Sequence, residues 1–278
     1  MTEFYTFDVI IDAQNLENLL AECICGGFAG YNEIPDGEKI KIRFYYYNKD
    51  LANEICDVLR KKYEMSKVCE VENRDWNEEW KKTITPVKVA DKIWVSPKWL
   101  EPTMFSGESW IKIEPQMAFG TGHHETTRIA AKLISQQYNG EKSLLDIGTG
   151  SGILAFVAQI VGYKSITGIE IDENCAENLQ QNLEDNKGRA DIRFIIGTIE
   201  KINVSAKFDA VAMNIIRSQS APLLKDICSI LSPNGVLIWS GILLEEKEKV
   251  IVEANDFGFD FRCEIIEKEW WGAKFIKK

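Results

Sequence analysis

The stretch Leu144-Leu145-Asp146-Ile147-Gly148-Thr149-Gly150-Ser151-Gly152-Ile153-Leu154-Ala155 joins two apolar runs through a glycine-rich turn. The pattern predicts a strand, a tight turn and a helix, because glycines adopt backbone conformations that other residues avoid and let a ligand approach closely. These glycines stand at relative positions one, three and five, whereas the dinucleotide fingerprint needs positions one, three and six. No phosphate loop of the Gly-x4-Gly-Lys-Ser/Thr type occurs in the chain. The turn therefore disfavours a pyrophosphate ligand and nucleotide hydrolysis.

Helical and extended patterns alternate around this turn. Helices are predicted over 126–137, 153–161, 175–186, 221–231 and 245–255, and strands over 144–147, 165–171, 192–196, 210–214 and 236–240, before a β-rich tail. This alternation is typical of a doubly wound, mostly parallel α/β sheet. Ligands bind such sheets at the carboxyl ends of the strands, so the residues there are the candidates for chemistry.

Acidic residues stand at the ends of two predicted strands. Glu170 lies 22 residues after Gly148, where a carboxylate can accept both ribose hydroxyl protons. Asp146 would repel phosphate but suits a ligand that carries an ammonium group and hydroxyls. Asp172 is interpreted as a helix cap, because its side chain can accept from free backbone amides. Together, the turn with Gly148 and Gly150 and the acidic residue on the next strand predict binding of S-adenosylmethionine.

Asn214 ends the apolar run of another predicted strand. One interpretation is an Asn that only forms a turn. The alternative follows from its place facing the same crevice, since its side-chain carbonyl can accept a hydrogen bond from an incoming amine. Asn214 is therefore the candidate for positioning the methyl acceptor.

Both histidines of the chain, His123 and His124, lie in a glycine-rich segment just before the predicted helix 126–137. They could order this loop or act as bases, and the pattern leaves both roles open. A metalloprotease motif is absent, because Arg128 stands where HExxH needs its second histidine. The cysteines form no CxxC pair, so no metal site is expected.

The first 75 residues predict a smaller α+β domain of the split-βαβ type. Extended runs at 4–11, 39–47 and 67–71 alternate with helical runs at 16–23 and 51–63. Residues 76–90 are interpreted as a linker and 91–278 as the main domain. Trp76 and Trp80 would share one helix face. They are interpreted as a hydrophobic anchor between the domains, and the alternative is a role in substrate binding. Extended pieces around 93–95 and 110–113 indicate a covering hairpin.

Charge and cysteine content exclude several classes of protein. The net charge is −10, and residues 1–75 hold 15 acidic and nine basic side chains. Residues 1–38 contain no Lys or Arg, which argues against a secretory or mitochondrial signal. No apolar run is long enough to span a membrane. An acidic surface repels nucleic acid and attracts basic partners, and seven scattered cysteines favour a reduced, cytoplasmic protein.

The combined motifs resemble those of the class I methyltransferases that modify ribosomal protein eleven of the large subunit. The resemblance covers nearly the whole of the C-terminal three quarters, whereas the first 70 residues match only in general layout. It is carried by Asp75-Trp76 through Trp80, Phe119-Gly120-Thr121-Gly122, Thr126-Thr127, Asp146 through Ala155, Asn214-Ile215, Ser240-Gly241-Ile242-Leu243 and Lys268-Glu269-Trp270.

The resemblance implies a protein methyltransferase that uses S-adenosylmethionine. It implies cofactor contacts at Thr127, Gly148, Glu170 and Asn214, with methylation of lysine side chains and of an N-terminal amine. It also implies that the N-terminal domain recognises a basic ribosomal protein of the large subunit, with no membrane or direct nucleic-acid partner. Many members carry Asp at the position of Glu170, and Leu-Ala where this chain has Ile216-Arg217.

Two other functions are compatible with the same fold. One is a methyltransferase that acts on RNA or on a small molecule, and the other is a nucleoside-binding module without catalysis. The acidic surface argues against RNA, and a small substrate would not need the N-terminal domain. The modified lysines, the number of methyl groups and the oligomeric state do not follow from the sequence.

Overall fold

The computed structural model describes residues 4–12, 15–23, 28–36, 39–71, 84–114, 120–140, 142–188, 190–203 and 207–278. The chain divides into two compact units, Met1–Ile84 and Thr85–Lys278. Trp76, Trp80 and most of the predicted linker lie outside the described residues, and β6 (Val87–Ala90) already belongs to the second unit.

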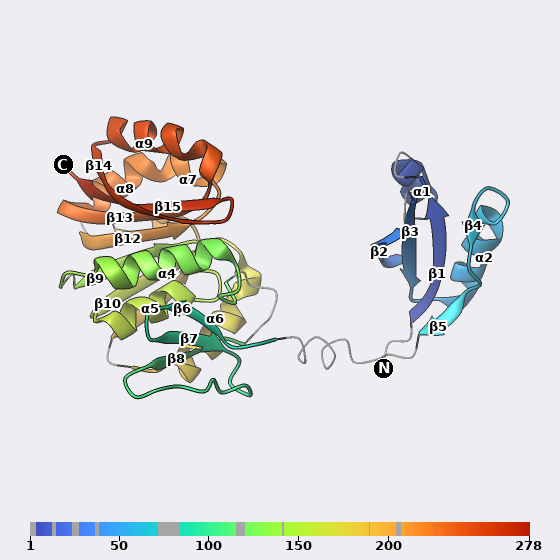
Figure 1. Ribbon diagram of the computed structural model, residues 1–278, viewed down its shortest axis with the longest axis horizontal. Helices are drawn as coiled ribbons and strands as arrows, with labels where there is room; N and C mark the ends of the chain where they lie inside the picture. Colours follow the sequence, from blue (N-terminus) through green and yellow to red (C-terminus); the bar gives the residue numbers. More distant parts are fainter. Residues whose placement is uncertain are drawn as a thin grey trace. The chain divides into compact units, whose positions relative to one another are not determined.

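The first unit is an antiparallel sheet with two helices. Its elements are β1 (Phe4–Ile11), α1 (Leu16–Cys23), β2 (Phe28–Asp36), β3 (Lys39–Tyr46), α2 (Lys49–Leu59), β4 (Glu64–Met65) and β5 (Cys69–Val71). The strand order β2-β3-β1-β4 is that of a split βαβ fold, which confirms the predicted layout (Figure 1). Alternate residues of β1 and β3, among them Val9, Ile42 and Phe44, are buried beneath the helices.

Strand β2 is missing from the sequence prediction. Gly30 and Pro35 break the strand pattern, and both residues weaken a strand that lies inside a sheet. The structure places β2 at the edge, where β3 is its single partner among the described strands and where the register shifts between Phe28 and Gly30. An edge strand tolerates both residues, so their low strand propensity wrongly argued against a strand in this segment.

The second unit is the predicted doubly wound α/β domain. Its remaining elements are β7 (Ile93–Ser96), β8 (Ser109–Lys112), α4 (Glu125–Gln137), β9 (Ser143–Ile147), α5 (Ile153–Val161), β10 (Ser165–Glu170), α6 (Ala176–Asp185), β11 (Asp191–Ile196), β12 (Phe208–Asn214), α7 (Arg217–Ser220), α8 (Leu224–Ile230), β13 (Leu231–Leu243), α9 (Lys247–Asp256), β14 (Phe259–Glu267) and β15 (Trp270–Lys277), with short 3-10 turns between some of them. The sheet order is β11-β10-β9-β12-β13-β15-β14. Strands β9 to β13 are parallel, and β15 is antiparallel to both of its neighbours, β13 and β14, which confirms a mostly parallel sheet.

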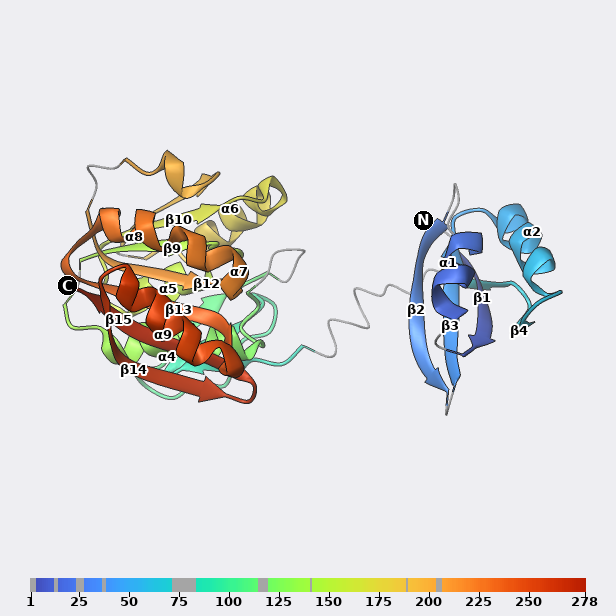
Figure 2. The same ribbon diagram turned by 90° about the horizontal axis from the view of Figure 1, so that it is seen from above.

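Successive residues along the strands of the sheet contribute to two hydrophobic cores, one on each face. Leu144, with the apolar faces of α4 and α5, belongs to one core, and Leu145, with those of α8 and α9, belongs to the other. Successive strand residues point to opposite faces, so the parallel strands are apolar on both sides. Figure 1 shows α4 and α5 packed along the strands, and Figure 2 looks onto the side covered by α7, α8 and α9.

The segment before α4 forms a separate three-stranded sheet, β6-β7-β8, beside α4 and α5 (Figure 1). The predicted hairpin between the pieces around 93–95 and 110–113 is wrong, and the antiparallel pair in this sheet is instead β6 with β7. The extended piece around Trp110 is not a hairpin arm, because β8 pairs with β7 in parallel, Trp94 opposite Trp110. A long loop over 97–108 makes this parallel pairing possible. No helix among the described residues is long and apolar enough to cross a membrane.

Candidate functional site

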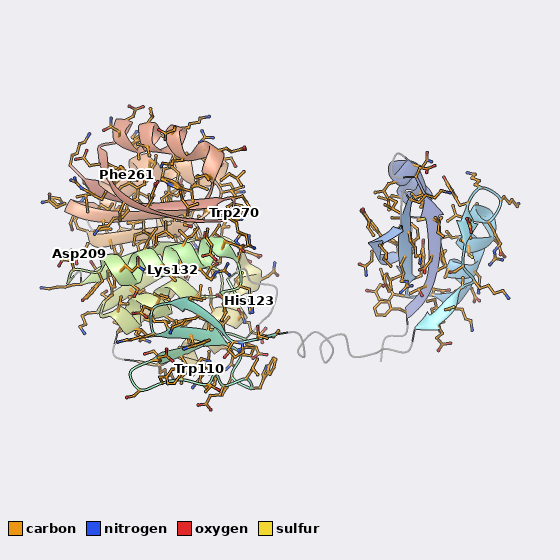
Figure 3. The ribbon with its side chains drawn as sticks, in the orientation of Figure 1. Trp110, His123, Lys132, Asp209, Phe261 and Trp270 are labelled. Carbon is orange, nitrogen blue, oxygen red and sulfur yellow. The ribbon has the colours of Figure 1, made fainter. Side chains whose placement is uncertain are left out.

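The predicted site residues gather at the carboxyl ends of β9, β10 and β12. These strands are neighbours in the sheet or share a neighbour, and Asp146 lies opposite Ala212 in the register. Figure 3 places His123 and Trp270 at this end of the domain and Asp209, from the start of β12, at the other. The sheet therefore brings Asp146 and Asn214, which lie 68 positions apart in the chain, to one edge.

The turn after β9 has the conformation that its glycines predict. Gly148, Gly150 and Gly152 all have positive φ angles, between 54° and 84°. At Gly148 an added Cβ would lie 2.9 Å from Cδ1 of Ile215. The N–H groups of Gly148 and Thr149 both donate to the carbonyl of Ile169 on β10, at 2.9 and 3.0 Å. The turn is thus held close to the neighbouring strand and leaves Gly148 exposed.

Asp146 is completely buried beneath this turn. Its Oδ2 accepts a hydrogen bond from the Thr149 hydroxyl at 2.6 Å. Burial raises the pKa of Asp146 from its usual value to about 7, and the negative charge of Glu170 adds to this effect, while the Thr149 hydrogen bond opposes it. At neutral pH the carboxyl group is therefore close to half protonated when no cation lies beside it.

Glu170, nearly buried at the end of β10, is fixed by three backbone N–H groups. Its Oε2 accepts from Gly150 at 2.9 Å, and its Oε1 accepts from Ile171 at 2.9 Å and from Asp172 at 3.1 Å. A carboxylate offers about four lone-pair sites, so at least one acceptor position, at Oε2, remains for a ribose hydroxyl. The next side chain, Ile171, is 72% exposed and offers an apolar surface beside the carboxylate.

Asn214 and Thr127 meet at the same edge. The Asn214 side-chain amide nitrogen donates to the Thr127 hydroxyl oxygen over 3.4 Å. Thr127 is fully buried in the first turn of α4. Ser240, opposite Asn214 on β13, donates through its hydroxyl to the carbonyl of Thr126 at 2.9 Å. The start of α4 is thus tied to two adjacent strand ends.

Two buried side-chain oxygens, Oδ1 of Asp146 and Oδ1 of Asn214, have no donor at normal hydrogen-bond geometry among the described residues, and the backbone N–H of Ala155 only partly offsets this for Asp146. A buried acceptor without a donor is costly, so such atoms commonly mark a place where a ligand binds. Both lie at the end of the sheet where the glycine turn leaves space for a close approach. These residues fit S-adenosylmethionine, whose ammonium group would supply a donor for Oδ1 of Asp146 and whose ribose would supply a hydroxyl donor for Glu170.

The histidines have structural partners. His124 caps α4, because its Nδ1 accepts from the backbone N–H of Thr126 at 3.3 Å, and its ring packs edge-on against Trp270 with centroids 5.1 Å apart. His123 Nε2 lies 3.1 Å from the carbonyl oxygen of Thr85. These contacts favour the loop-ordering role for both. Among the residues that the structure describes, no group of three or more His, Cys, Asp or Glu is placed to hold a metal ion.

Ion pairs fix the elements around the site. Arg217, at the start of α7, makes two hydrogen bonds to Glu253 of α9, at 2.6 and 3.1 Å. Arg217 thus joins α7 to α9. Arg128 of α4 binds Glu267 of β14, and Lys268 binds Glu125 at 2.6 Å. The Lys268 ammonium group lowers the pKa of Glu125 to about 2.

Two further residues support the site but do not stand out in the sequence. Ser151 donates to the carbonyl of Gly120 at 2.7 Å, which ties the glycine turn to the segment before α4. Asn182 of α6 is fully buried, donates to the carbonyl of Ser151 at 2.9 Å and accepts from the N–H of Glu114 at 3.1 Å. Ser151 lies inside the motif. Asn182 gives no local signal, because its partners are distant in the sequence.

The comparisons with known proteins agree with this geometry. Residues 10–278 match the family model described as ribosomal protein L11 methyltransferase (PrmA). The ribosomal protein L11 methyltransferase of Fusobacterium nucleatum is 35% identical over 210 residues, which cover 75% of this chain and 67% of that protein. That of Streptococcus mutans is 31% identical over 208 residues, covering 75% of this chain and 65% of the relative. The aligned region therefore spans about two thirds of each relative.

A solved structure shares the fold. The ribosomal protein L11 methylase of Lactobacillus delbrueckii subsp. bulgaricus superposes with a TM-score of 0.64 at 26% identity, over 70% of this chain and 100% of that one. The family match covers most of the chain, including every predicted site residue. The family, the enzyme class and the cofactor predicted from the sequence are confirmed. The chain therefore belongs to the ribosomal protein L11 methyltransferase family, whose members are S-adenosylmethionine-dependent methyltransferases.

Proposed function

We propose that this chain methylates lysine side-chain and N-terminal amines of ribosomal protein L11. The observation that carries the proposal is the buried Oδ1 of Asn214, an acceptor without a donor at the cofactor edge of the sheet. An amine nitrogen is a donor that fits this atom. A hydrogen bond from the amine to Oδ1 would hold the nitrogen in place and direct its lone pair, so that orientation contributes to the rate.

Four of the six predicted residues would contact the cofactor, and the other two, Thr127 and Asn214, would act on the acceptor amine beside it. Glu170 would bind a ribose hydroxyl, Asp146 would interact with the ammonium group, and Gly148 and Gly150 would give the ligand close access to the turn. Thr127 would orient Asn214. S-adenosylmethionine supplies the electrophilic methyl group on its sulfonium sulfur. The exposed side chain of Ile171 offers an apolar face for the adenine ring.

Deprotonation of the acceptor limits the reaction near neutral pH. A free lysine has a pKa near 10.4, so only about 0.04% of it is neutral at pH 7. His123 and His124 are bonded to the loop and to the start of α4, and neither is assigned as a base. The proton leaves to water, and nearby positive charge and partial desolvation increase the neutral fraction.

We assign recognition of the protein substrate to the first unit, Met1–Ile84. Its sequence is acidic, with eight acidic and no basic residues in positions 1–38. This charge favours a basic protein and disfavours direct binding to nucleic acid. We infer from such a substrate that the enzyme acts in the cytoplasm, and scattered cysteines without a CxxC pair are compatible with that location. All six cysteines that the structure describes are free thiols.

The test is mass spectrometry of purified ribosomal protein L11 after incubation with the enzyme and S-adenosylmethionine. We expect methyl groups on lysine side chains and on the N-terminal amine, and faster transfer as the pH rises from 7 to 9. Methyl label in ribosomal RNA would indicate the RNA-acceptor alternative. Tight cofactor binding without transfer to L11, RNA or a small amine would indicate a binding module instead.

A further inference from the structure

A groove of about 560 Å³ lies beside the site, at the end of β13 and the turn between β14 and β15. It is lined by Leu243, Leu244, Glu245 and Glu269. The two walls are joined by a hydrogen bond from the N–H of Leu244 to the carbonyl of Glu269, at 2.8 Å. We call these four residues the Leu243–Glu269 groove. The described contacts of the cofactor site do not include any of them.

The groove lies close to Asn214. Asn214 pairs with Ser240 on β13, and the groove begins at Leu243, three residues further along the same strand. Three residues of chain extend at most about 11 Å. The groove is therefore near enough to Asn214 for residues that flank an acceptor amine in a protein substrate to reach it.

The carboxylates of Glu245 and Glu269 in the groove have no basic partner in the described part of the protein. Neighbouring charges are paired, Glu246 with Arg217 and Lys268 with Glu125. Glu245 and Glu269 are exposed and form no ion pair with any residue in the described part of the chain. Leu244, between them in the lining, is 39% exposed. The groove thus combines an apolar floor with two unpaired negative charges.

We propose that the Leu243–Glu269 groove binds the basic residues that flank the acceptor amine of the protein substrate, a conclusion that rests on the proposed function. A lysine or arginine fits both features, because its aliphatic stem packs on leucine while its charged head reaches the carboxylates. The groove determines which amines of the substrate are methylated efficiently. It selects acceptors in a basic sequence context and contributes nothing to cofactor binding.

The experiment compares the double variant Glu245→Gln/Glu269→Gln with the wild type, using purified ribosomal protein L11 as the acceptor. We expect KM for L11 to rise about 3- to 10-fold at low salt, with kcat and the Kd for S-adenosylmethionine unchanged. The difference should shrink at high salt, because exposed charge pairs are screened. Leu244→Ser should also raise KM, but without changing its dependence on salt.

The matched control is Glu200→Gln/Asp256→Asn, which removes two exposed carboxylates far from the groove, after β11 and at the end of α9. This control should leave KM unchanged. Equal values of KM for the groove variant and the wild type, or an equal rise in the control, would overturn the proposal. Failure of the wild type itself to methylate L11 would overturn the proposed function, and the two failures are therefore distinct.

Discussion

The side-chain amide nitrogen of Asn214, at the end of β12, lies 3.4 Å from the hydroxyl oxygen of Thr127, in the first turn of α4. This contact fixes which end of the amide is available. Since the nitrogen is directed to Thr127, the oxygen is left as the unsatisfied acceptor. The distance is long for a hydrogen bond, and such contacts in ligand-free sites commonly shorten when substrate binds.

Removing the Thr127 hydroxyl should therefore slow transfer by letting the Asn214 amide turn. We expect Thr127→Val to lower kcat about 3- to 10-fold and Asn214→Ala to lower it about 10- to 100-fold, which is about 1.4 to 2.7 kcal/mol. Cofactor affinity should change much less in both. Single-turnover rates and calorimetric Kd values would separate these effects.

Thr127→Ser is the control for this pair, because it keeps the hydroxyl. The double variant Thr127→Val/Asn214→Ala should be no slower than Asn214→Ala alone, since the hydroxyl acts through the amide. Additive losses in the double variant would show that Thr127 acts independently of Asn214. Equal losses of turnover and of cofactor affinity in Asn214→Ala would contradict its role toward the amine.

Replacing Glu170 should affect the cofactor more than the chemistry. Its carboxylate accepts three backbone N–H groups and retains at least one site for a ribose hydroxyl. We expect Glu170→Ala to raise the Kd for S-adenosylmethionine about 10- to 100-fold, or about 1.4 to 2.7 kcal/mol. Isothermal titration calorimetry measures this change, with Glu170→Asp as the control that keeps the charge. An unchanged Kd in Glu170→Ala would refute the assignment.

The sequence predicted the carboxyl edge of the sheet well. The predicted carboxyl ends of the strands that carry Asp146, Glu170 and Asn214 differ from the observed carboxyl ends by no more than one residue. These strands are buried on both faces, so their apolar runs stop where the chain leaves the core. The motif residues stand at those stops, and for that reason their position at the carboxyl edge of the sheet could be predicted from the sequence.

Other features depend on partners far away in the chain. The long β13 extends from Leu231 to Leu243, beyond the predicted strand, because β15 pairs with its end. His124 is a helix cap, which an N-cap preference for Ser, Thr, Asp and Asn does not predict. The raised pKa of Asp146 comes from its complete burial, and the spacing of residues in the sequence does not show how deeply a side chain is buried.

Because Asp146 is buried, we expect the free energy of unfolding of this domain to fall as the pH rises. Its pKa is about 7 in the folded protein against an ordinary value of 3.8. Between these values the folded chain holds a proton that the unfolded chain has released, so this contribution is fully present below about pH 4 and lost by about pH 7. At 1.36 kcal/mol per pH unit, the loss from pH 5 to pH 7 is about 2 to 3 kcal/mol.

Asp146→Asn removes this titration and should be the more stable protein at pH 8 when no cofactor is bound. Thermal unfolding at pH 5 to 8 measures the effect as a gap in Tm between the variant and the wild type, which should widen with pH and level off above pH 7. The same variant should bind S-adenosylmethionine more weakly, since it has lost a carboxylate. A gap in Tm that is the same at every pH would show that Asp146 is charged throughout.

Gly148 and Gly241 both lie close to Ile215, the first to its side chain and the second to its backbone. A Cβ at Gly148 would meet the side chain, 2.9 Å from Cδ1 of Ile215, whereas a Cβ at Gly241 would meet the backbone of Ile215 at 2.8 Å. Both glycines also have positive φ angles, 67° and 86°. Alanine at either position should destabilise the domain, because both the conformation and the contact disfavour a side chain.

Truncation of Ile215 should separate the two cases. We expect Gly148→Ala to cost about 2 to 4 kcal/mol in the wild type and about 1 to 2 kcal/mol in an Ile215→Ala background, where only the backbone strain remains. Gly241→Ala should cost the same in both backgrounds, because truncation leaves the backbone of Ile215 in place. Urea unfolding followed by tryptophan fluorescence reports mainly on this domain, since six of the eight tryptophans of the chain lie in the second unit, Thr85–Lys278. Equal relief of both alanine variants by Ile215→Ala would mean that the side-chain contact is not what excludes a Cβ at Gly148.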